Sequence, residues 1–265
     1  MGFRHSGNMN YTLITGASSG IGKALSIRCA AEGYNLILVG RDQVALQELA
    51  SLLKEKHAIS AEPLTVDLLS PGAAEYVYKQ CRKNNWAVRI LINNAALAQW
   101  GPFEELSLDH MQEVMTLNQQ VLVSLCHYFA PMLKEVPFAH ILNVACTAAF
   151  QPIPFLSVYA ASKSFVLSFS QSLRYELKEK QINVSCLCPG PTDTAFFEKI
   201  GFQDISRSRG AIMKTEEVAD TAIAGLIRKE AVIVPGFSNQ IGAGFSRYFP
   251  KKWMVGMIGK FFRPK

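Results

Sequence analysis

The sequence lacks the features of membrane-spanning, low-complexity and disulfide-stapled proteins. It contains no run of about 18 apolar residues, the length that a spanning helix needs. Glycine and proline number 18 and 12, ordinary values that exclude collagen-like and low-complexity sequence. Six cysteines in 265 residues indicate reduced core thiols, not a disulfide framework. No second Cys or His pair completes a zinc site beside Cys186 and Cys188, so we expect no metal.

Acidic residues are absent from the end of the chain. Residues 231–265 hold no Asp or Glu but carry Arg247, Lys251, Lys252, Lys260, Arg263 and Lys265, which account for the whole net charge of +6. The remaining body is neutral, so we expect no nucleic-acid partner. The first ten residues are polar and resemble no signal peptide, so we expect a cytoplasmic protein.

Short apolar runs alternate with amphipathic stretches along the chain. Seven runs are typical of strands: 11–15, 35–39, 62–66, 89–93, 140–145, 183–188 and 232–234. Nearly continuous apolar runs indicate strands covered on both faces, and strands alternating with helices form parallel βαβ units. We predict an α/β fold in which residues 1–236 form one doubly wound, Rossmann-like domain with roughly seven parallel strands. A basic, amphipathic and aromatic tail follows over residues 237–265.

Local signals predict where the helices begin and end. One helix is expected to end at Gly33, and the next to begin at Asp42, which can cap it. Another is expected to start at Ser70, with Pro71 in its first position. Further helices are expected over residues 107–133, over 158–177 and from residue 215.

A glycine-rich turn, TGASSGIG, joins the first predicted strand to the first predicted helix at residues 15–22. Its glycines permit a tight turn and close approach of the backbone to a pyrophosphate, and the helix N-terminus offers free N–H groups. Because the turn lies between a strand and a helix, it predicts a dinucleotide site. The expected binding residues are Gly16, Ser18, Ser19, Gly20, Ile21 and Gly22. The alternative is a tight turn whose serines only cap the helix.

The end of the second predicted strand bears on the choice of cofactor. A carboxylate at this place usually binds a ribose 2′-hydroxyl, whereas Arg accommodates a 2′-phosphate. Here Gly40 occupies the carboxylate position and Arg41 follows, so we expect NADP(H). Asp42 leaves two alternatives open, because it can pair with Arg41 or cap the helix.

Tyr159 and Lys163 are four residues apart and share one face of a predicted helix. A tyrosine hydroxyl ordinarily has a pKa of about 10. A nearby ammonium favours the phenolate, so we expect Lys163 to lower the pKa of Tyr159 toward the working range of a general acid or base.

Together these features resemble the short-chain dehydrogenase/reductase family over roughly residues 10–195. The matching positions are the glycine-rich turn, Asp67, Asn93-Asn94-Ala95, Asn118, Tyr159 with Lys163, and Pro189-Gly190-Pro191-Thr192. The resemblance implies an oxidoreductase in which Tyr159 is the general acid or base and Lys163 binds the nicotinamide ribose. It implies that Asn118 supports a proton relay to Lys163. The implied cofactor residues beyond the turn are Arg41, Asp67, Asn94, Ala95, Ala96, Tyr159, Lys163, Pro189, Gly190, Thr192 and Thr194. It also implies a homo-oligomer, with contacts through the helices over 107–133 and 158–177.

The sequence departs from the family pattern at two positions. Ala96 replaces a usual Gly, a mild change if its φ is ordinary. Cys146 stands where the family's substrate-orienting Ser usually lies, and a thiol is the weaker hydrogen-bond donor. Thr147 or Ser157 can take over this role, or Cys146 can serve at reduced strength. The remaining hypothesis is a dinucleotide-binding sensor or structural protein with weak or lost catalysis.

Apolar residues gather around the expected substrate end and in the tail. The former are Trp100, Phe150, Pro152, Pro154, Phe155, Phe196 and Phe197, which predict a small hydrophobic carbonyl or alcohol as substrate. In the tail, aromatic residues interleave with cations, a pattern typical of peripheral membrane contact or of a lid over the substrate. The favoured alternative is a terminal helix docked on its own domain or on a partner subunit.

Overall fold

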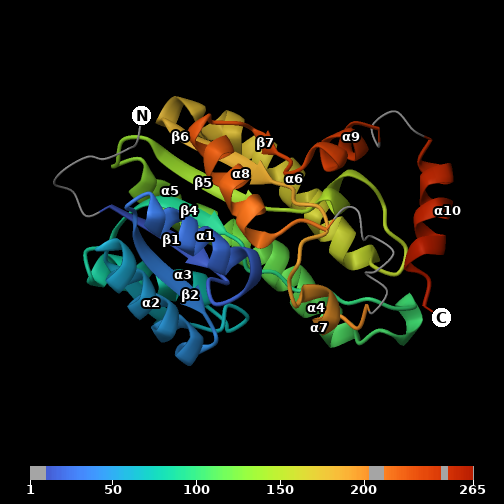
Figure 1. Ribbon diagram of the computed structural model, residues 1–265, viewed down its shortest axis with the longest axis horizontal. Helices are drawn as coiled ribbons and strands as arrows, with labels where there is room; N and C mark the ends of the chain where they lie inside the picture. Colours follow the sequence, from blue (N-terminus) through green and yellow to red (C-terminus); the bar gives the residue numbers. More distant parts are fainter. Residues whose placement is uncertain (1–9, 203–211, 246–249, 265) are drawn as a thin grey trace.

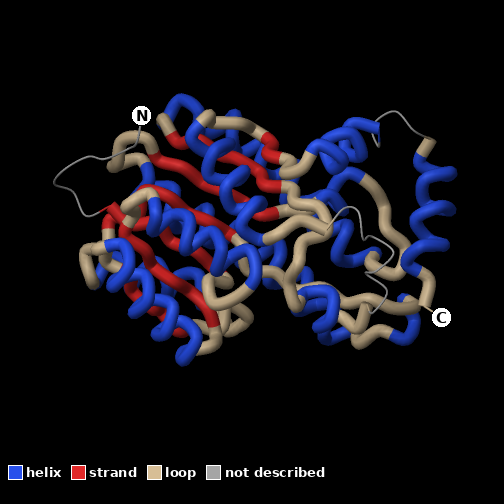
Figure 2. Tube along the Cα trace, viewed as in Figure 1, coloured by secondary structure: helices blue, strands red, loops and turns tan. Residues whose placement is uncertain are grey.

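The computed structural model describes residues 10–202, 212–245 and 250–264, and its strands form one parallel sheet (Figures 1 and 2). The strand order is β3-β2-β1-β4-β5-β6-β7. The strands are β1 (Asn10–Thr15), β2 (Asn35–Gly40), β3 (Ala61–Thr65), β4 (Ala87–Asn93), β5 (Ala139–Val144), β6 (Ile182–Leu187) and β7 (Val232–Ile233). The predicted fold class and all seven predicted strands are confirmed.

Helices cover both faces of the sheet. One apolar cluster joins it to α1 (Gly20–Ala31), α2 (Gln43–His57) and α8 (Thr215–Ile227). A second cluster, on the other face, joins it to α3 (Ala73–Lys83), α5 (Leu122–Leu133) and α6 (Ser157–Leu177). Every strand-to-strand pairing is parallel, so all carboxyl ends lie along one edge of the sheet.

The order of the strands reverses beside β1. The chain runs from β1 outward to β2 and β3, then returns to β4 on the opposite side of β1. In such open sheets, ligands bind in the crevice outside the carboxyl ends at the reversal point. Thr15 and Asn93, the last residues of β1 and β4, lie at this point.

The helix boundaries follow the predicted signals with one exception. Gly33 follows α1 with φ of 82°, and Asp42 caps α2 by accepting a hydrogen bond from the Ala45 amide at 3.0 Å. The prediction that Ser70 starts a helix is wrong, because α3 begins at Ala73. The Ser70 amide instead closes a turn on the carbonyl of Asp67 at 3.1 Å.

The predicted helix over 107–133 is divided into three parts. It begins with α4 (Leu108–Met115), capped by Ser107, passes through the π-helical turn η2 (Thr116–Val121) and ends with α5. A π turn inserts an extra residue and often occurs at a functional site. Here it contains Asn118.

The last two described helices are α9 (Phe237–Phe245) and α10 (Lys251–Phe262), of which α10 lies at the end of the molecule opposite α2 (Figure 1). The shorter elements are η1 (Phe103–Glu105), η3 (Thr147–Phe150), η4 (Lys178–Lys180) and α7 (Phe196–Lys199). Within the described ranges, no helix has the length and apolar character needed to cross a membrane. The polar residues 1–9, the tail cations Arg247 and Lys265, and the tail aromatic residues Tyr248 and Phe249 lie outside those ranges.

Candidate active site

The predicted acid/base pair lies on α6, against the carboxyl end of β5. Tyr159 and Lys163 are buried, with 9% and 3% of their surfaces exposed. Lys163 Nζ lies 5.7 Å from the centre of the Tyr159 ring and donates a hydrogen bond to the carbonyl of Val144 at 2.9 Å. Val144 is the last residue of β5, so this bond fixes the ammonium at the edge of the sheet where ligands bind.

Burial controls the ionisation of both groups. It raises the pKa of Tyr159 well above the ordinary value, and contact with Cys146 raises it further. It lowers the pKa of Lys163 to about 8. The expectation that Lys163 lowers the pKa of Tyr159 is therefore wrong for this structure, because desolvation of the phenol dominates and the pKa is raised. A phenol that holds its proton at neutral pH suits a general acid.

Asn118 reaches this pair through a residue that the sequence analysis missed. Its side-chain amide donates to the Ser162 hydroxyl at 3.0 Å, and Ser162 donates to the Tyr159 carbonyl at 2.7 Å. Asn118 also exchanges two hydrogen bonds of 2.9 Å with the backbone of Leu97. It thus ties the loop after β4 to the start of α6. The signal for Ser162 was its position three residues after Tyr159, on the same helical face.

Of the three candidates for orienting a substrate, Cys146 is the one that influences the pKa of Tyr159. Cys146 directly precedes η3, is half-buried, and packs in the same apolar cluster as Tyr159. Thr147 is also half-buried, with its Oγ1 4.0 Å from the Cys146 sulfur. Ser157 is exposed at the first position of α6. The geometry therefore favours the thiol, with Thr147 beside it.

The glycine-rich turn has the geometry of a phosphate cradle. Gly16 and Gly20 adopt φ of 66° and 52°. A Cβ on Gly22 would lie 2.1 Å from the Gly16 carbonyl oxygen, so only glycine fits there. Ser19 precedes α1 without a side-chain capping bond, contrary to the alternative in which the serines cap the helix. The first N–H groups of α1 thus suit an anionic group.

Asn94 locks this turn to the end of β4. Its side-chain amide donates to the carbonyls of Thr15 at 2.9 Å and Gly16 at 3.3 Å. The Thr15 hydroxyl in turn accepts from the backbone amides of Asn94 and Ala95, at 2.9 and 3.0 Å. Ala96 is not among the residues with positive φ, so the extra methyl group causes no backbone strain. Thr15 was also missed as a positioning residue.

The residues expected near the adenosine half lie at the ends of β2 and β3. Arg41 and Asp67 are both exposed. Gly40 packs closely enough that a Cβ would lie 3.5 Å from the Ser18 hydroxyl. The alternatives for Asp42 are resolved, since it caps α2. This arrangement presents a cation, without a carboxylate side chain at Gly40, next to the glycine-rich turn.

The segment after β6 reaches the same edge of the sheet. The Pro189 carbonyl accepts from the Thr147 amide at 2.9 Å, and Thr192 Oγ1 donates to the Gly190 carbonyl at 2.9 Å. A Cβ on Gly20 would lie 3.2 Å from the Thr194 methyl group. The predicted residues on either side of the crevice therefore meet.

An apolar cluster surrounds Tyr159. Its buried members are Ala98, Ala148, Ile153, Leu156, Tyr159 and Ala160, and its half-buried members are Trp100, Cys146, Phe196, Ile200, Ile258 and Phe262. The Phe196 ring lies 5.5 Å from the Tyr159 ring. Ile258 and Phe262 belong to α10, so the predicted docking of a terminal helix on its own domain is confirmed.

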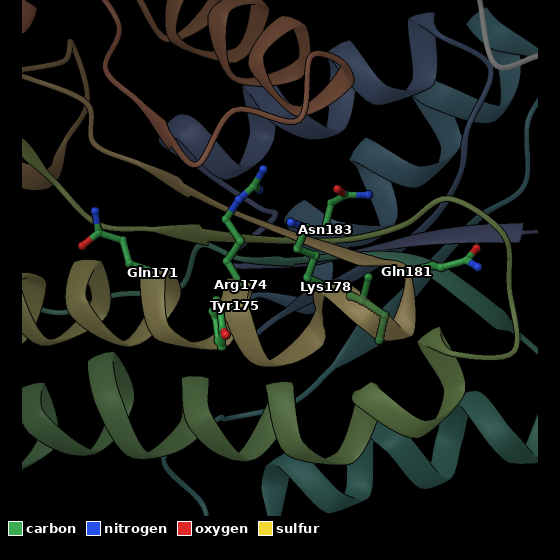
Figure 3. A pocket seen from close by; sticks show the side chains of 7 residues that line it. Gln171, Arg174, Tyr175, Lys178, Gln181 and Asn183 are labelled. Carbon is green, nitrogen blue, oxygen red and sulfur yellow. The ribbon is translucent and has the colours of Figure 1, made fainter.

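One hollow on the surface lies elsewhere. It has a volume of about 410 Å³ and is lined by Gln171, Arg174, Tyr175, Lys178, Gln181, Ile182 and Asn183. Arg174 and Tyr175 point in opposite directions from α6 (Figure 3). Arg174 donates to the carbonyls of Val184 and Lys229, both at 2.7 Å, which explains it as a structural residue. Far from Tyr159 and Lys163, this hollow offers no comparable chemistry.

The cysteines other than Cys146 are buried. Burial raises the pKa of Cys29, Cys81 and Cys126 to about 12, which keeps them as unreactive thiols. Cys186 and Cys188 face the same way, with their sulfurs 3.9 Å apart. In the part of the chain that the structure covers, no group of three or more His, Cys, Asp or Glu could hold a metal ion.

Comparison with known proteins agrees with this geometry. The sequence model of the family described as "short chain dehydrogenase" matches residues 10–204. The chain is 29% identical over 255 residues to the "Probable oxidoreductase EphD" of Mycobacterium tuberculosis, covering 90% of this chain but only 43% of that one.

Two solved structures are similar over most of both chains. One is a short-chain dehydrogenase from Sphingobium yanoikuyae in complex with NADPH, with a TM-score of 0.80, 32% identity, and 91% and 97% of the two chains covered. The other is the bulky-bulky ketone specific alcohol dehydrogenase from Comamonas testosteroni, with a TM-score of 0.77, 29% identity, and 92% and 96% covered.

Proposed function

The chain belongs to the short-chain dehydrogenase/reductase family, and from this membership we propose that it is an NADP(H)-dependent oxidoreductase. It interconverts a carbonyl and an alcohol on a small hydrophobic substrate. The observation that carries this proposal is the buried pair of Tyr159 and Lys163 at the carboxyl edge of the sheet. If Tyr159 and Lys163 only packed the core or bound an ion, a buried phenol beside a buried ammonium would not be required. A role in proton transfer does require this pair.

Each residue has a distinct task in this reaction. A bound nicotinamide dinucleotide supplies or accepts the hydride. In reduction, Tyr159 donates its phenolic proton to the carbonyl oxygen. In oxidation, the Tyr159 phenolate removes the proton from the alcohol hydroxyl. Lys163 holds the nicotinamide ribose from its anchor on Val144. Asn118 fixes the start of α6 through Ser162 and supports the proton relay to Lys163. Cys146 orients the substrate oxygen.

The remaining site residues hold the cofactor. Gly16, Ser18, Ser19, Gly20, Ile21 and Gly22 surround its phosphates, and the cradle described above suits them. Asp67, Asn94, Ala95 and Ala96 line its path across the sheet edge, and Pro189, Gly190, Thr192 and Thr194 border its nicotinamide end. Arg41 binds the 2′-phosphate, a preference supported by the absence of a side chain at Gly40 and the capping role of Asp42. The similar structure from Sphingobium yanoikuyae holds NADPH.

The substrate is hydrophobic because the groups around Tyr159 are. Phe196, together with Ile258 and Phe262 of α10, belongs to the apolar cluster around the phenol. A polar substrate would lose its hydrogen bonds to water there without replacement. The similar structure from Comamonas testosteroni belongs to an enzyme specific for bulky ketones, which supports the same class.

The decisive experiment is Tyr159→Phe, measured by NADPH consumption over ketones and aldehydes of increasing size. We expect a loss of about 10²–10⁴-fold in turnover, the usual contribution of a general acid, with the NADPH dissociation constant unchanged. Tyr175→Phe is the matched control, because Tyr175 lies on the same helix but is 82% exposed. Equal turnover in wild type and Tyr159→Phe would refute the role of the phenol.

A second candidate function is a dinucleotide-binding sensor or structural protein without appreciable turnover. The observation that favours it is the thiol of Cys146 in place of a hydroxyl. This function requires tight NADPH binding, and it requires that NADPH is not oxidised in the presence of any carbonyl compound of the same panel. The Cys146→Ser variant separates the two candidates, as argued in the Discussion.

The outward face of α10 supports peripheral contact of a cytoplasmic protein with an anionic lipid surface. Trp253 and Met257 are 73% and 63% exposed, and the exposed Lys252 and Lys260 lie on the same side of the helix. We expect the full chain to sediment with vesicles of phosphatidylcholine and phosphatidylglycerol, but not with phosphatidylcholine alone. The double variant Lys252→Glu, Lys260→Glu should remain in the supernatant. Equal sedimentation of both proteins excludes this contact.

A homo-oligomer is the remaining proposal about partners. Exposed aromatic residues on α6, among them Phe165 stacked on Phe169 at 5.8 Å, suit burial between subunits. Light scattering after size exclusion tests this, with a mass of 29.3 kDa excluding it.

A further inference from the structure

We propose that the inner face of α10 forms one wall of the substrate site, where Ile258 and Phe262 determine how long an apolar group the enzyme accepts. This inference rests on the proposed function, because it assigns a boundary to the site around Tyr159. It goes beyond that function by naming specificity-determining residues in a helix outside the family match at residues 10–204.

Packing places α10 beside the reacting group. Ile258 and Phe262 belong to the apolar cluster that contains Tyr159, although about a hundred residues separate them in sequence. A Cβ on Gly259 would lie 3.2 Å from the Pro154 ring, so the helix approaches the loop before α6 closely. This loop leads directly to Tyr159. The helix is therefore a neighbour of the site and not a detached tail.

A hydrogen bond and a group of rings hold the end of the helix in place. Trp100 Nε1 donates to the Phe262 carbonyl at 2.9 Å. The Phe202 ring lies 5.3 Å from the Trp100 ring and 5.1 Å from the Phe262 ring. Trp100 follows β4 and Phe202 follows β6, so the contacts join α10 to both sides of the crevice.

Consecutive residues of α10 face different surroundings. Met254 is buried and Ile258 is half-buried in the cluster, whereas Trp253 and Met257 are mainly exposed. Met257 and Ile258 are similar in size and hydrophobicity. They therefore form a matched pair of positions, one inside the proposed wall and one outside it.

The burial of Tyr159 explains why this wall selects the substrate. Only 9% of its surface is exposed, so a substrate reaches the hydroxyl by displacing apolar side chains. An apolar group replaces the contacts that those side chains lose, whereas a polar group does not. Ile258 and Phe262 then limit the length of that apolar group. Shortening either side chain admits a substrate with a longer apolar group.

The first experiment measures kcat/KM for methyl ketones of increasing chain length, in buffer without vesicles. For Ile258→Ala and Phe262→Ala, we expect the ratio of long-chain to short-chain kcat/KM to rise about tenfold, which corresponds to roughly two methylene groups of burial. Met257→Ala should keep the wild-type ratio. Identical chain-length profiles for Ile258→Ala and Met257→Ala overturn the inference.

The second experiment needs no turnover and uses a probe already in the chain. Cys146 is the one cysteine that is not buried, and it belongs to the same cluster as Ile258. We expect N-ethylmaleimide to modify it about tenfold faster in Ile258→Ala, Phe262→Ala and Trp100→Phe, but at the wild-type rate in Met257→Ala. Mass spectrometry of the intact protein and its peptides gives the rates.

The two experiments fail separately from the proposed function. If Tyr159→Phe keeps full turnover while the modification rates change as expected, the acid/base role is wrong and the wall of α10 stands. If all variants modify at one rate and keep one chain-length profile, α10 is no part of the site, whatever the result for Tyr159.

Discussion

Lys163 is bonded through its ammonium group to the carbonyl of Val144, 2.9 Å away, and both residues are buried. Burial lowers the pKa of Lys163 from 10.5 to about 8. The unfolded chain therefore binds more protons than the folded one between these values. Below about pH 8 the buried, charged lysine lowers the free energy of unfolding by the full value of the pKa shift. This stability is recovered as the pH rises from about 8 to 10.5. The site is maintained at the expense of stability.

We predict that Lys163→Met is more stable than wild type at pH 7 but inactive. Removing the buried charge gains about 3 kcal/mol from the pKa shift, and losing the hydrogen bond to Val144 offsets about half of this. Urea unfolding at pH 7 and above pH 9 measures the difference, which should shrink at the higher pH. Lys79→Met, at an exposed position on α3, is the control. A less stable Lys163→Met at pH 7 would show that the ammonium supports the fold.

His140 predicts an acid-sensitive step in stability. It is 3% exposed within β5, and its Nδ1 atom has no hydrogen-bond partner among the described atoms. Burial lowers its pKa from 6.5 to about 4, and the nearby positive charge of Arg89 adds to the shift. The unfolded state thus binds more protons between pH 4 and 6.5, and stability is lost as the pH falls through this interval.

Between pH 7 and pH 4, we expect the free energy of unfolding of the wild type to fall by about 3 kcal/mol more than that of His140→Leu. Chemical unfolding at these two values measures it. His127→Leu is the matched control, since His127 is exposed and its replacement removes a histidine without a buried charge. Parallel losses for wild type and His140→Leu would assign acid sensitivity to other groups.

The sequence predicted the sheet well because each strand is covered on both faces. Strand β2, for example, is continuously apolar from Leu36 to Val39 and fully buried, so composition alone marks it. The cap at Asp42 and the glycine-rich turn at Gly22 were predictable for another reason, because each depends on one residue and its immediate neighbours. Local signals fix local structure.

What the sequence could not predict depends on contacts between distant segments. The bond from Trp100 to Phe262 joins residues 162 positions apart, and no periodicity reveals it. The pKa of Tyr159 is set by how deeply α6 is buried, so the proximity of Lys163 in the sequence gave the wrong direction. Ser70 has the residue type of a cap, yet it closes a turn on Asp67 instead.

Arg41 should decide between the two nicotinamide cofactors. It is exposed at the end of β2, next to the side-chain-free Gly40. Losing a charged hydrogen bond to a phosphate costs about 1.5–3 kcal/mol, so Arg41→Ala should weaken NADPH binding roughly 10–100-fold. NADH binding should change little. Calorimetry or nicotinamide fluorescence gives both dissociation constants.

A control for general charge effects is Arg82→Ala, because Arg82 is exposed in the last turn of α3, outside the site. It removes the same charge and should leave both affinities unchanged. If Arg41→Ala keeps the wild-type ratio of NADPH to NADH affinity, the preference arises elsewhere and the assignment of Arg41 is wrong.

Cys146 decides how strongly the site can catalyse. Its thiol packs in the apolar cluster that contains Tyr159, where a hydroxyl would be the stronger donor to a substrate oxygen. A single donor to a developing oxyanion can contribute about 10²–10³-fold in rate. We therefore expect Cys146→Ser to raise kcat/KM by at least about tenfold, with an unchanged NADPH dissociation constant.

The neighbouring hydroxyls provide the comparison. Thr147 lies beside the thiol, whereas Ser157 is exposed, so Thr147→Val and Ser157→Ala test whether either already supplies the hydrogen bond. A large loss in Thr147→Val, with no gain in Cys146→Ser, would transfer the role to Thr147. If wild type and Cys146→Ser both bind NADPH but leave every carbonyl compound unreduced, the sensor becomes the better account.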